Sequence, residues 1–386
     1  MPGISGNSRS PGGGSGPRST VLDDRNVRIE PQRWPLADGR ELMFFSLPGH
    51  DAAPLPDRRV LPVRTGSHTE LRLDRQTGEW VVIAALRQNR TYKPAPDQCP
   101  LCPGPSGISS EVPAPGYDVV VFENRFPSLA GDSSAGLPDT VDGFTSAPGN
   151  GHCEVIAFSS DHTGRFADLD ADHALLVVQA WRHRTAELMA RPGIEEVFCF
   201  ENRGEEIGVT LTHPHGQIYA YPYLTPRTAT MLRQARLHRE RHGTNLFARI
   251  LADEVDQGSR IVARNDSFTA FVPFASRWPL EVHIYPHRFV RNLTDLDGAE
   301  LEGFARIYLD VLGRFDRLYD APLPYMSALH QYTEDDAQRE GYFHVELLSI
   351  RRTATKIKYL ASSESAMGAF INDTTPEIVA GRLREL

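Results

Sequence analysis

The chain has 386 residues, of which 40% are hydrophobic and 24% are charged, and this balance is typical of a globular protein. Its formal charge of −9 gives no global basic field for nucleic acid, and no apolar run reaches the roughly 18 residues that a membrane helix needs. Four cysteines are too few for a disulfide framework, which favours a reducing, cytoplasmic compartment. We therefore expect no nucleic-acid or membrane partner, and any bound phosphate must meet a local cationic pocket.

Two segments are rich in loop-forming residues. Residues 1–20 contain 14 Gly, Ser or Pro, and we expect them to form a disordered tail. Residues 127–151 are rich in Gly, Ser, Asp and Pro and predict a long surface loop. β-Branched and aromatic residues predict strands at residues 79–84, 118–122, 154–158, 197–201, 217–221, 268–273, 281–285 and 342–348.

Helical patterns alternate with these strands. Two sets of side chains have helical spacing, namely Leu175, Val178, Thr185 and Leu188, and then Leu301, Phe304, Tyr308, Leu312 and Phe315. An acidic segment precedes the first set, and aspartate there can cap free backbone amides.

An internal repeat relates the two halves of the chain. Residues 154–158, EVIAF, recur as residues 281–285, EVHIY, and Asp168-Leu169 recur as Asp295-Leu296, both at an offset of 127 residues. We infer an α+β fold built from a duplicated unit with a mainly antiparallel sheet. The predicted halves are residues 21–225 and 226–386, and one larger domain with a coincidental similarity is the alternative.

The run Thr212-His213-Pro214-His215-Gly216-Gln217 carries most of the chemical information. In an extended segment His213 and His215 project to the same side, and Pro214 fixes the backbone between them. A neutral imidazole is a nucleophile toward phosphorus without a strong base, Gln217 can donate to a phosphoryl oxygen, and Gly216 leaves room for a phosphate. The alternative is that both histidines are structural or ligate a metal.

Cys99 and Cys102 form a C-x-x-C pair. No thioredoxin-like βαβ pattern adjoins it, so zinc is favoured over a redox pair, and an unmetallated loop is the remaining alternative. His152 and Cys153 are rival ligands for such a zinc, while Cys199 is expected to be a small core residue.

Together with Phe200-Glu201-Asn202 and Gly208, the histidine run resembles the galactose-1-phosphate uridylyltransferases, a branch of the histidine triad superfamily, over about residues 72–384. The resemblance implies a fold of two histidine-triad-like units, a half-barrel flanked by helices. It also implies a ping-pong exchange of UMP between UDP-glucose and galactose 1-phosphate. In that exchange His215 would carry UMP as a covalent adduct, and Gln217 would bond the transferred phosphoryl group.

The resemblance also concerns metals. It implies that His162 and His213 complete a structural zinc site with the two cysteines. For a second metal, usually iron, His330 and His344 match two family ligands, whereas Glu346 replaces a histidine and Met231 stands at the position of a glutamate. We therefore do not predict that second metal.

Further residues match family positions that contact the substrates: Arg87, Arg90, Asn124, Asn202 and Thr210 for the nucleotide and phosphates, and Lys358, Tyr359 and Glu364 for the hexose phosphate. Some positions depart from the family pattern. Arg125 replaces an aspartate beside the nucleotide contact Asn124, and Thr210 replaces a serine but keeps the hydroxyl. At the sugar end Ser363 replaces a tyrosine and Phe370 a glutamine, which leaves open a modified hexose 1-phosphate as the acceptor.

Two other classes of function remain open. One is a nucleotide-sugar phosphorylase or hydrolase of the ADP-glucose type, and the other is a zinc-stabilised protein that binds nucleotides without catalysis. Family members build the active site between two subunits, so the resemblance implies a homodimer that binds UDP-glucose, UDP-galactose and sugar 1-phosphates.

Overall fold

The structure of the protein is a computed structural model that describes residues 29–61, 69–89, 93–131, 139–141, 143–319, 321–335 and 337–386. The predicted tail at residues 1–20 and the candidate site residue Arg90 lie outside the described residues.

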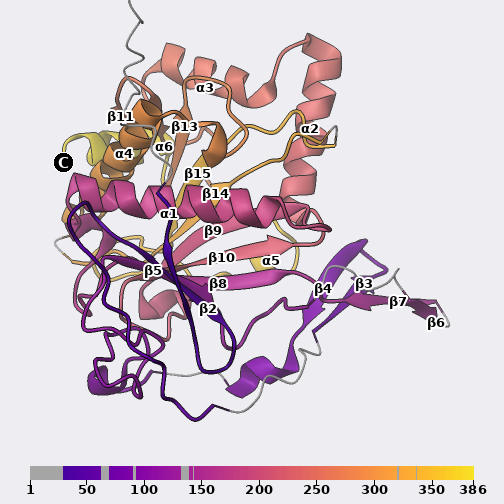
Figure 1. The fold of residues 1–386 in the computed structure, drawn as a ribbon. Coiled ribbons are helices and arrows are strands. Elements are labelled where there is room, and N and C mark those ends of the chain that lie inside the picture. The colour runs from indigo at the N-terminus through magenta and orange to yellow at the C-terminus, as the bar shows by residue number, and fades with distance from the viewer. Residues whose placement is uncertain are drawn as a thin grey trace, which may run out of the picture.

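One large sheet forms the body of the molecule (Figure 1). It has 11 strands in the order β1-β2-β5-β8-β10-β9-β14-β15-β13-β12-β11, and neighbouring strands are antiparallel. The strands are β1 (Gln32–Pro35), β2 (Glu41–Phe45), β5 (Val119–Glu123), β8 (His152–Ala157), β9 (Glu196–Arg203), β10 (His215–Tyr221), β11 (Ile261–Arg264), β12 (Phe268–Phe271), β13 (Leu280–Pro286), β14 (Tyr325–His330) and β15 (His344–Ser349).

Helices cover both faces of this sheet. The α-helices are α1 (Ala171–Met189), α2 (Pro226–His242), α3 (Leu246–Gln257), α4 (Gly298–Arg317), α5 (Ser362–Ser365) and α6 (Pro376–Arg384), and short 3-10 helices span Ala85–Asn89, Pro96–Gln98, Phe166–Asp168, Glu205–Ile207 and Leu293–Asp295. None of the described helices has the length and hydropathy needed to cross a bilayer. The large antiparallel sheet flanked by helices confirms the predicted α+β class.

The internal repeat is visible in the structure. The 3-10 helix Phe166–Asp168 and α1 correspond to Leu293–Asp295 and α4 at the same offset of 127 residues. An aspartate caps the N-terminus of both α1 and α4. The Asp170 side chain accepts from His173 N, and the Asp297 side chain accepts from Glu300 N. These side chains satisfy free amides at both helix starts. The boundary at residue 225 stays a prediction, since β9 and β14, from opposite sides of it, pair in one sheet.

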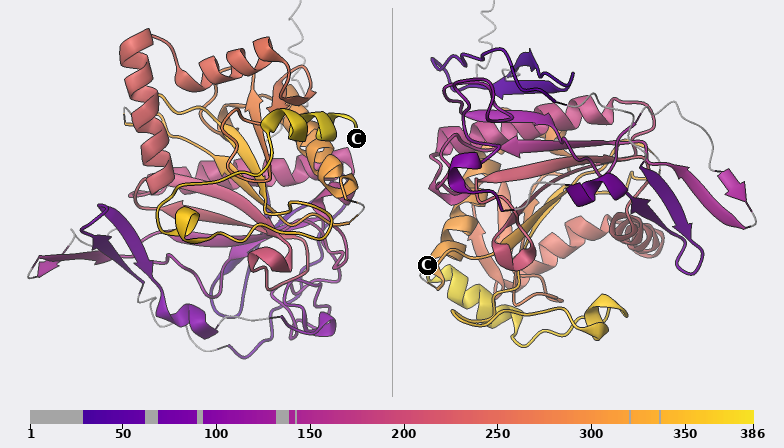
Figure 2. Two further views of the ribbon diagram at one scale, coloured as in Figure 1. Left: turned by 180° about the vertical axis from the view of Figure 1, so that it is seen from behind. Right: turned by 90° about the horizontal axis from the view of Figure 1, so that it is seen from below.

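The main core lies between the sheet and the pair α1 and α4, which pack against each other. Phe166 and Trp181 stack in it with ring centroids 5.8 Å apart, and Tyr308 contacts both rings. A second apolar cluster on the other face joins α2 and α3 to β12, β13 and Tyr342. Seen from behind, the C-terminal segment with α5 also lies on the face opposite α1 (Figure 2).

A smaller sheet projects from one end of the body (Figures 1 and 2). Its order is β4-β3-β7-β6, and its strands are β3 (Glu70–Asp74), β4 (Glu79–Ile83), β6 (Asp139–Val141) and β7 (Phe144–Pro148). The prediction of a continuous loop over residues 127–151 is therefore wrong for β6 and β7. β7 has small and polar residues at its centre and is held by backbone pairing with β3, so its composition does not reveal a strand.

Strand β10 positions the candidate site. It lies between β8 and β9 and is hydrogen-bonded on both edges. Ile218 and Ala220 point into the main core, so His215, Gln217 and Tyr219 share the opposite face. The pairing on both edges fixes the register of these three side chains.

Candidate functional site

His215 is the first residue of β10, and its side chain is half-buried. Its Nδ1 lies 2.8 Å from the carbonyl oxygen of His213. A carbonyl can only accept, so Nδ1 carries the hydrogen and Nε2 keeps a lone pair. Burial lowers the pKa of His215, partly opposed by that carbonyl, which keeps the ring neutral near pH 7. The geometry presents one uncharged nitrogen nucleophile.

Two cavities meet at His215. One has a volume of about 180 Å³ and the other about 520 Å³, and both are lined by His215 and Leu211. The smaller cavity is lined by three of the predicted nucleotide and phosphate contacts, Arg87, Asn124 and Thr210, together with Gln217. Asn202 lines the larger cavity instead, on the other side of the histidine. A substrate that occupied both cavities would cross the face of His215.

The smaller cavity has apolar walls of Leu101, Phe122 and Phe126. Its polar lining includes the carboxylate of Glu111, which sequence reasoning missed, and Arg125. This mixture suits a flat ring with a few hydrogen-bonding groups.

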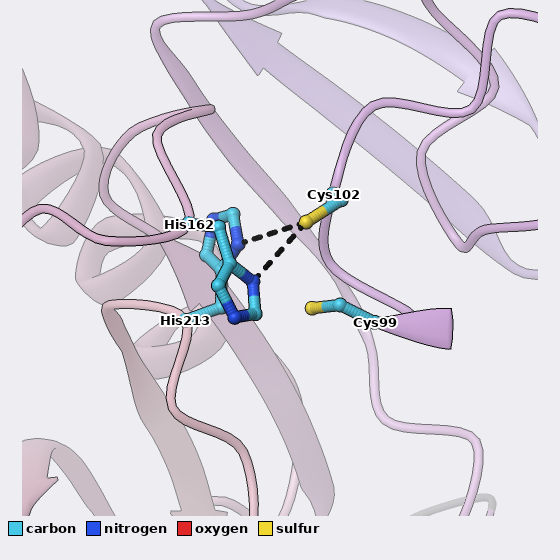
Figure 3. Close-up of side chains that lie close together, drawn as sticks. All are labelled: Cys99, Cys102, His162 and His213. Carbon is cyan, nitrogen blue, oxygen red and sulfur yellow. Dashed lines mark hydrogen bonds between the residues drawn. The ribbon is translucent and has the colours of Figure 1, made fainter. Parts of the chain in front are cut away.

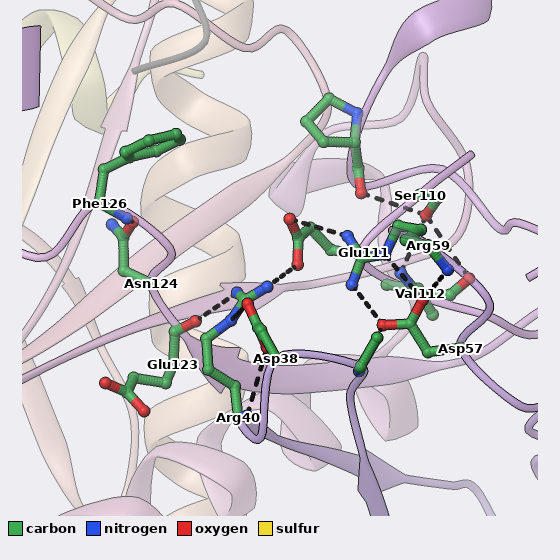
Figure 4. Close-up of polar contacts among 12 residues, drawn as sticks. Asp38, Arg40, Asp57, Arg59, Ser110, Glu111, Val112, Glu123, Asn124 and Phe126 are labelled. Carbon is green, nitrogen blue, oxygen red and sulfur yellow. Dashed lines mark hydrogen bonds and ion pairs between the residues drawn. The ribbon is translucent and has the colours of Figure 1, made fainter. Parts of the chain in front are cut away.

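Glu111 is held by two arginines (Figure 4). Arg40 Nη2 lies 2.5 Å from Oε2 of Glu111, and Arg59 Nη1 lies 2.9 Å from Oε1. Arg40 also donates to the carbonyl oxygen of Glu123 at 2.9 Å, one residue before Asn124. The Asn124 Oδ1 accepts from Phe126 N at 2.9 Å. The arginine and the asparagine thus fix two walls of the smaller cavity relative to each other.

Ion pairs line the larger cavity. Arg165 and Arg203 both pair with Asp316, at 3.1 and 2.7 Å. Burial raises the pKa of Glu201 to about 7, although Tyr325 Oη donates to it at 2.8 Å. Cationic and hydrogen-bonding groups therefore lie beside His215 on this side.

Cys99, Cys102, His162 and His213 form a compact group (Figure 3), as predicted for the first metal site. Their ligand atoms lie within 4.8 Å of one another, and Cys102 Sγ is 3.3 Å from His162 Nδ1 and 3.5 Å from His213 Nδ1. The rival His152 instead contacts Glu154, and Cys153 accepts from Leu129 N.

The two imidazoles are oriented for metal binding. His213 Nε2 lies 2.7 Å from the Ser159 carbonyl oxygen, so Nε2 carries the hydrogen and Nδ1 faces the sulfurs with a lone pair. His162 Nε2 contacts Thr212 Oγ1 at 3.2 Å. Burial and the neighbouring Cys99 raise the pKa of the Cys102 thiol to about 12, so two thiolates here need a cation between them. The donor set fits a four-coordinate metal ion.

His330, His344 and Glu346 form a second buried group, with ligand atoms also within 4.8 Å. Here Arg227 Nη2 donates to both carboxylate oxygens of Glu346, at 2.6 and 2.7 Å. Met231 packs against the apolar cluster around α3. A metal ion in this group would have to displace the guanidinium from its carboxylate.

The three predicted hexose contacts lie away from both cavities. Lys358 Nζ pairs with Glu364 Oε1 at 2.9 Å, and Tyr359 is 77% exposed. Ser363 donates to the Ala369 carbonyl, and Phe370 packs on Trp278. Among the described residues that line the two cavities, none comes from the segment 351–372.

Sequence reasoning also missed Tyr219, whose hydroxyl contacts Gln217. The alternation of strand side chains could have identified it, because it stands two residues after Gln217. No local pattern could have identified Glu111, since Arg40 and Arg59 are 71 and 52 residues away along the chain.

Comparisons with known proteins show the family of the chain. The family model described as galactose-1-phosphate uridyl transferase, N-terminal domain, matches residues 56–225, and that of the C-terminal domain matches residues 232–386. Galactose-1-phosphate uridylyltransferase of Streptomyces lividans is 44% identical over 362 residues, covering 91% of this chain and 96% of the relative. That of Thermotoga maritima is 36% identical over 318 residues, covering 82% and 98%.

Solved structures of related proteins share the fold of this chain. A uridylyltransferase structure is 30% identical with a TM-score of 0.73, covering 82% of this chain and 97% of its own. An ADP-glucose phosphorylase from Arabidopsis thaliana, 20% identical with a TM-score of 0.63 over 82% and 99% of the two chains, shares the fold. Fold, site and relatives together define a nucleotidyltransferase. The chain belongs to the galactose-1-phosphate uridylyltransferase family, whose members are transferases of galactose metabolism.

Proposed function

We propose that the protein exchanges UMP between UDP-glucose and galactose 1-phosphate through a covalent adduct on His215. The observation that carries this proposal is the unprotonated Nε2 of His215 at the junction of two cavities, with Nδ1–H held by the His213 carbonyl. The relatives named galactose-1-phosphate uridylyltransferase support the substrates.

The chemistry balances without a separate base. Nε2 attacks the α-phosphorus of UDP-glucose, the P–N bond forms, and the P–O bond to glucose 1-phosphate breaks with its electron pair on the departing oxygen. A phosphate oxygen of galactose 1-phosphate then attacks the same phosphorus, and the P–N pair returns to the imidazole. The amide of Gln217 would donate to a phosphoryl oxygen in both steps.

The two cavities suit the two parts of the substrate. The apolar walls and Asn124 of the smaller cavity suit a nucleoside, and Thr210 can reach its phosphate. The larger cavity, with Asn202 and arginines beside His215, suits the departing or attacking sugar phosphate. Arg87 and Arg90 are proposed to act at the phosphates, as the family match implies.

The cysteine and histidine group is proposed to bind one structural zinc ion. Its four protein donors leave no position for a reactive water, so zinc would tie the loop of Cys99 and Cys102 to the histidine run. Reduced thiols are needed for such a site, which supports a cytoplasmic location.

UDP-glucose alone tests the central step. We expect one equivalent of glucose 1-phosphate to be released per active site, together with an acid-labile UMP adduct that mass spectrometry of peptides assigns to His215. His215→Asn should lose turnover by at least about a thousandfold, because the nucleophile is absent. The control His238→Asn, on α2 and outside the lining of both cavities, should be unchanged. Adduct formation by His215→Asn would overturn the proposal.

The acceptor is tested with the same adduct. Galactose 1-phosphate should discharge it faster than inorganic phosphate, water or other hexose 1-phosphates, and ADP-glucose should form it slowly. Faster discharge of the adduct by inorganic phosphate would favour a phosphorylase instead. Faster discharge by another hexose 1-phosphate would indicate that the substitutions at Ser363 and Phe370 change which sugar phosphate the enzyme accepts.

A further inference from the structure

Strand β10 places a hydroxyl behind the amide of Gln217. Tyr219 follows two residues later on the same face, and its Oη donates to Gln217 Oε1 at 3.1 Å. Tyr219 is buried, whereas Gln217 lines the smaller cavity with His215. The nucleophile, the amide and the hydroxyl therefore follow one another along a single strand face.

Arg87 determines which way the hydroxyl points. Its Nη1 donates to Ser128 Oγ at 2.6 Å, to the Phe126 carbonyl oxygen at 3.2 Å and to Tyr219 Oη at 3.3 Å. A guanidinium can only donate, so the tyrosine oxygen is an acceptor toward Arg87 and must direct its own proton elsewhere. Ser128 Oγ, 3.3 Å away, also receives a bond from Arg87 and can return its proton to Tyr219. The phenol proton is thus left for Gln217.

The direction of these bonds matters for the amide. A side-chain amide has an oxygen that only accepts and a nitrogen that only donates. If the oxygen faces Tyr219, the NH₂ group faces the cavity and can donate to a phosphoryl oxygen. The flipped amide would turn its own oxygen toward that negatively charged group and would repel it.

We propose that Tyr219 is a positioning residue, through which Arg87 sets the direction of the Gln217 amide so that it donates into the smaller cavity. The inference rests on the proposed function, because the benefit arises only when a phosphoryl group is transferred at His215. It assigns Arg87 a second role, fixing a hydrogen-bond chain as well as carrying positive charge.

Burial supports this role. It raises the pKa of Tyr219, with Cys153 adding to the rise and Arg87 opposing it, so the hydroxyl keeps its proton near neutral pH. The ring packs edge-on against Phe200 with centroids 5.1 Å apart, which fixes the position of the oxygen. Removing only that oxygen leaves the packing of the ring in place.

Tyr219→Phe tests the proposal in single-turnover reactions with UDP-glucose. We expect the rate constant for adduct formation to fall about five- to tenfold, with the UDP-glucose concentration for half-maximal rate changed less than about twofold. Tyr221→Phe is the matched control, since it removes the next hydroxyl along the same strand face. It should leave both quantities unchanged, and thermal unfolding should confirm that both variants fold.

A double-mutant cycle separates positioning from a structural effect. If Tyr219 acts through Gln217, Tyr219→Phe should cost less than about twofold once Gln217→Ala has removed the amide. Equal losses in both backgrounds, or no loss in the wild-type background, would overturn the role of Tyr219. A wild-type protein that forms no adduct from UDP-glucose would instead overturn the proposed function on which the role rests.

Discussion

His213 serves two neighbours at once. Its ring directs Nδ1 toward Cys102, while its backbone carbonyl holds Nδ1 of His215 at 2.8 Å. Pro214 lies between the two histidines and limits how far they can move independently. Whatever fixes the ring of His213 therefore also fixes the tautomer and direction of His215.

This coupling predicts the effect of metal loss. The purified protein should contain about one zinc per chain by plasma mass spectrometry, and Cys102→Ser should lose it. We expect the variant to melt several degrees lower and to form the uridylyl adduct at least about tenfold more slowly, because the histidine run is released. The control Cys199→Ala alters a buried cysteine outside the group and should keep its metal. Full activity in a zinc-free wild-type protein would contradict the coupling.

Other residues of the site differ in how visible they are in the sequence. The histidine run and the C-x-x-C pair are local patterns, and the structure brings Cys99, Cys102, His162 and His213 together as expected. Glu111 has no local pattern, since its position depends on Arg40, just before β2, and on Arg59, in the segment before the smaller sheet. Residues that depend on distant partners cannot be inferred from one sequence.

At the scale of elements, a buried ion pair joins β8 to α1. Arg184 donates to both carboxylate oxygens of Glu154, at 2.9 and 2.7 Å, and both side chains are almost fully buried. Burial alone would raise the pKa of Glu154, but Arg184 and His152 lower it to about 2, against an ordinary value of 4.5. The native state therefore holds this carboxylate ionised more strongly than the unfolded chain does.

The depressed pKa predicts acid sensitivity. The contribution of ionised Glu154 to the free energy of unfolding is complete above about pH 5. It is lost as the pH falls toward 2, because the carboxylate of the unfolded chain takes up its proton at a higher pH than that of the native state. Glu154→Gln should lose on the order of 3 kcal/mol of unfolding free energy at pH 7 in urea titrations, and less of it at pH 3. The exposed pair of Glu302 and Arg306 provides a control, and Glu302→Gln should change stability by less than about 0.5 kcal/mol at either pH. A loss independent of pH would contradict the ionic origin.

The elements that the sequence predicts are those with strong local signals. All eight predicted strand segments overlap strands, and α1 and α4 follow the predicted spacing. The sequence does not predict β14, because its central Met326, Ser327 and Ala328 lack β-branched side chains. It does not predict α2 either, because the apolar stripe of this helix is narrow and lies among many arginines. β14 is held by pairing with β9 and β15, and α2 is held by packing on the sheet.

At the scale of the whole molecule, the C-terminal segment is separated from the chain's own cavities. Tyr359 is exposed, yet its family match implies contact with the hexose phosphate. A homodimer in which each subunit lends this segment to its partner would reconcile the two observations. The match to the family predicted the residues, but a single chain does not bring them to His215.

Mixed dimers test this arrangement. His215→Asn and Tyr359→Ala should each be nearly inactive alone, but unfolding and refolding them together should restore about a quarter of wild-type activity, since half the dimers then contain one intact site. Mixing His215→Asn with Gln217→Ala is the control, because both changes affect the same cavity and no intact site can form. A wild-type protein with full activity at the 43.0 kDa mass of one chain in light scattering would contradict the dimer.

The alternation of β10 separates two kinds of evolutionary change. Gly216, Ile218 and Ala220 face the packed interior, so substitutions there alter folding, whereas His215 and Gln217 face the cavity and Tyr219 packs in a smaller apolar cluster behind them, so substitutions there alter the site. An insertion or deletion of one residue in β10 would turn each set of side chains to the other face of the sheet, and both the packing and the site would be lost. Selection can therefore adjust reactivity by single substitutions at alternate positions, while the spacing among them is inherited intact.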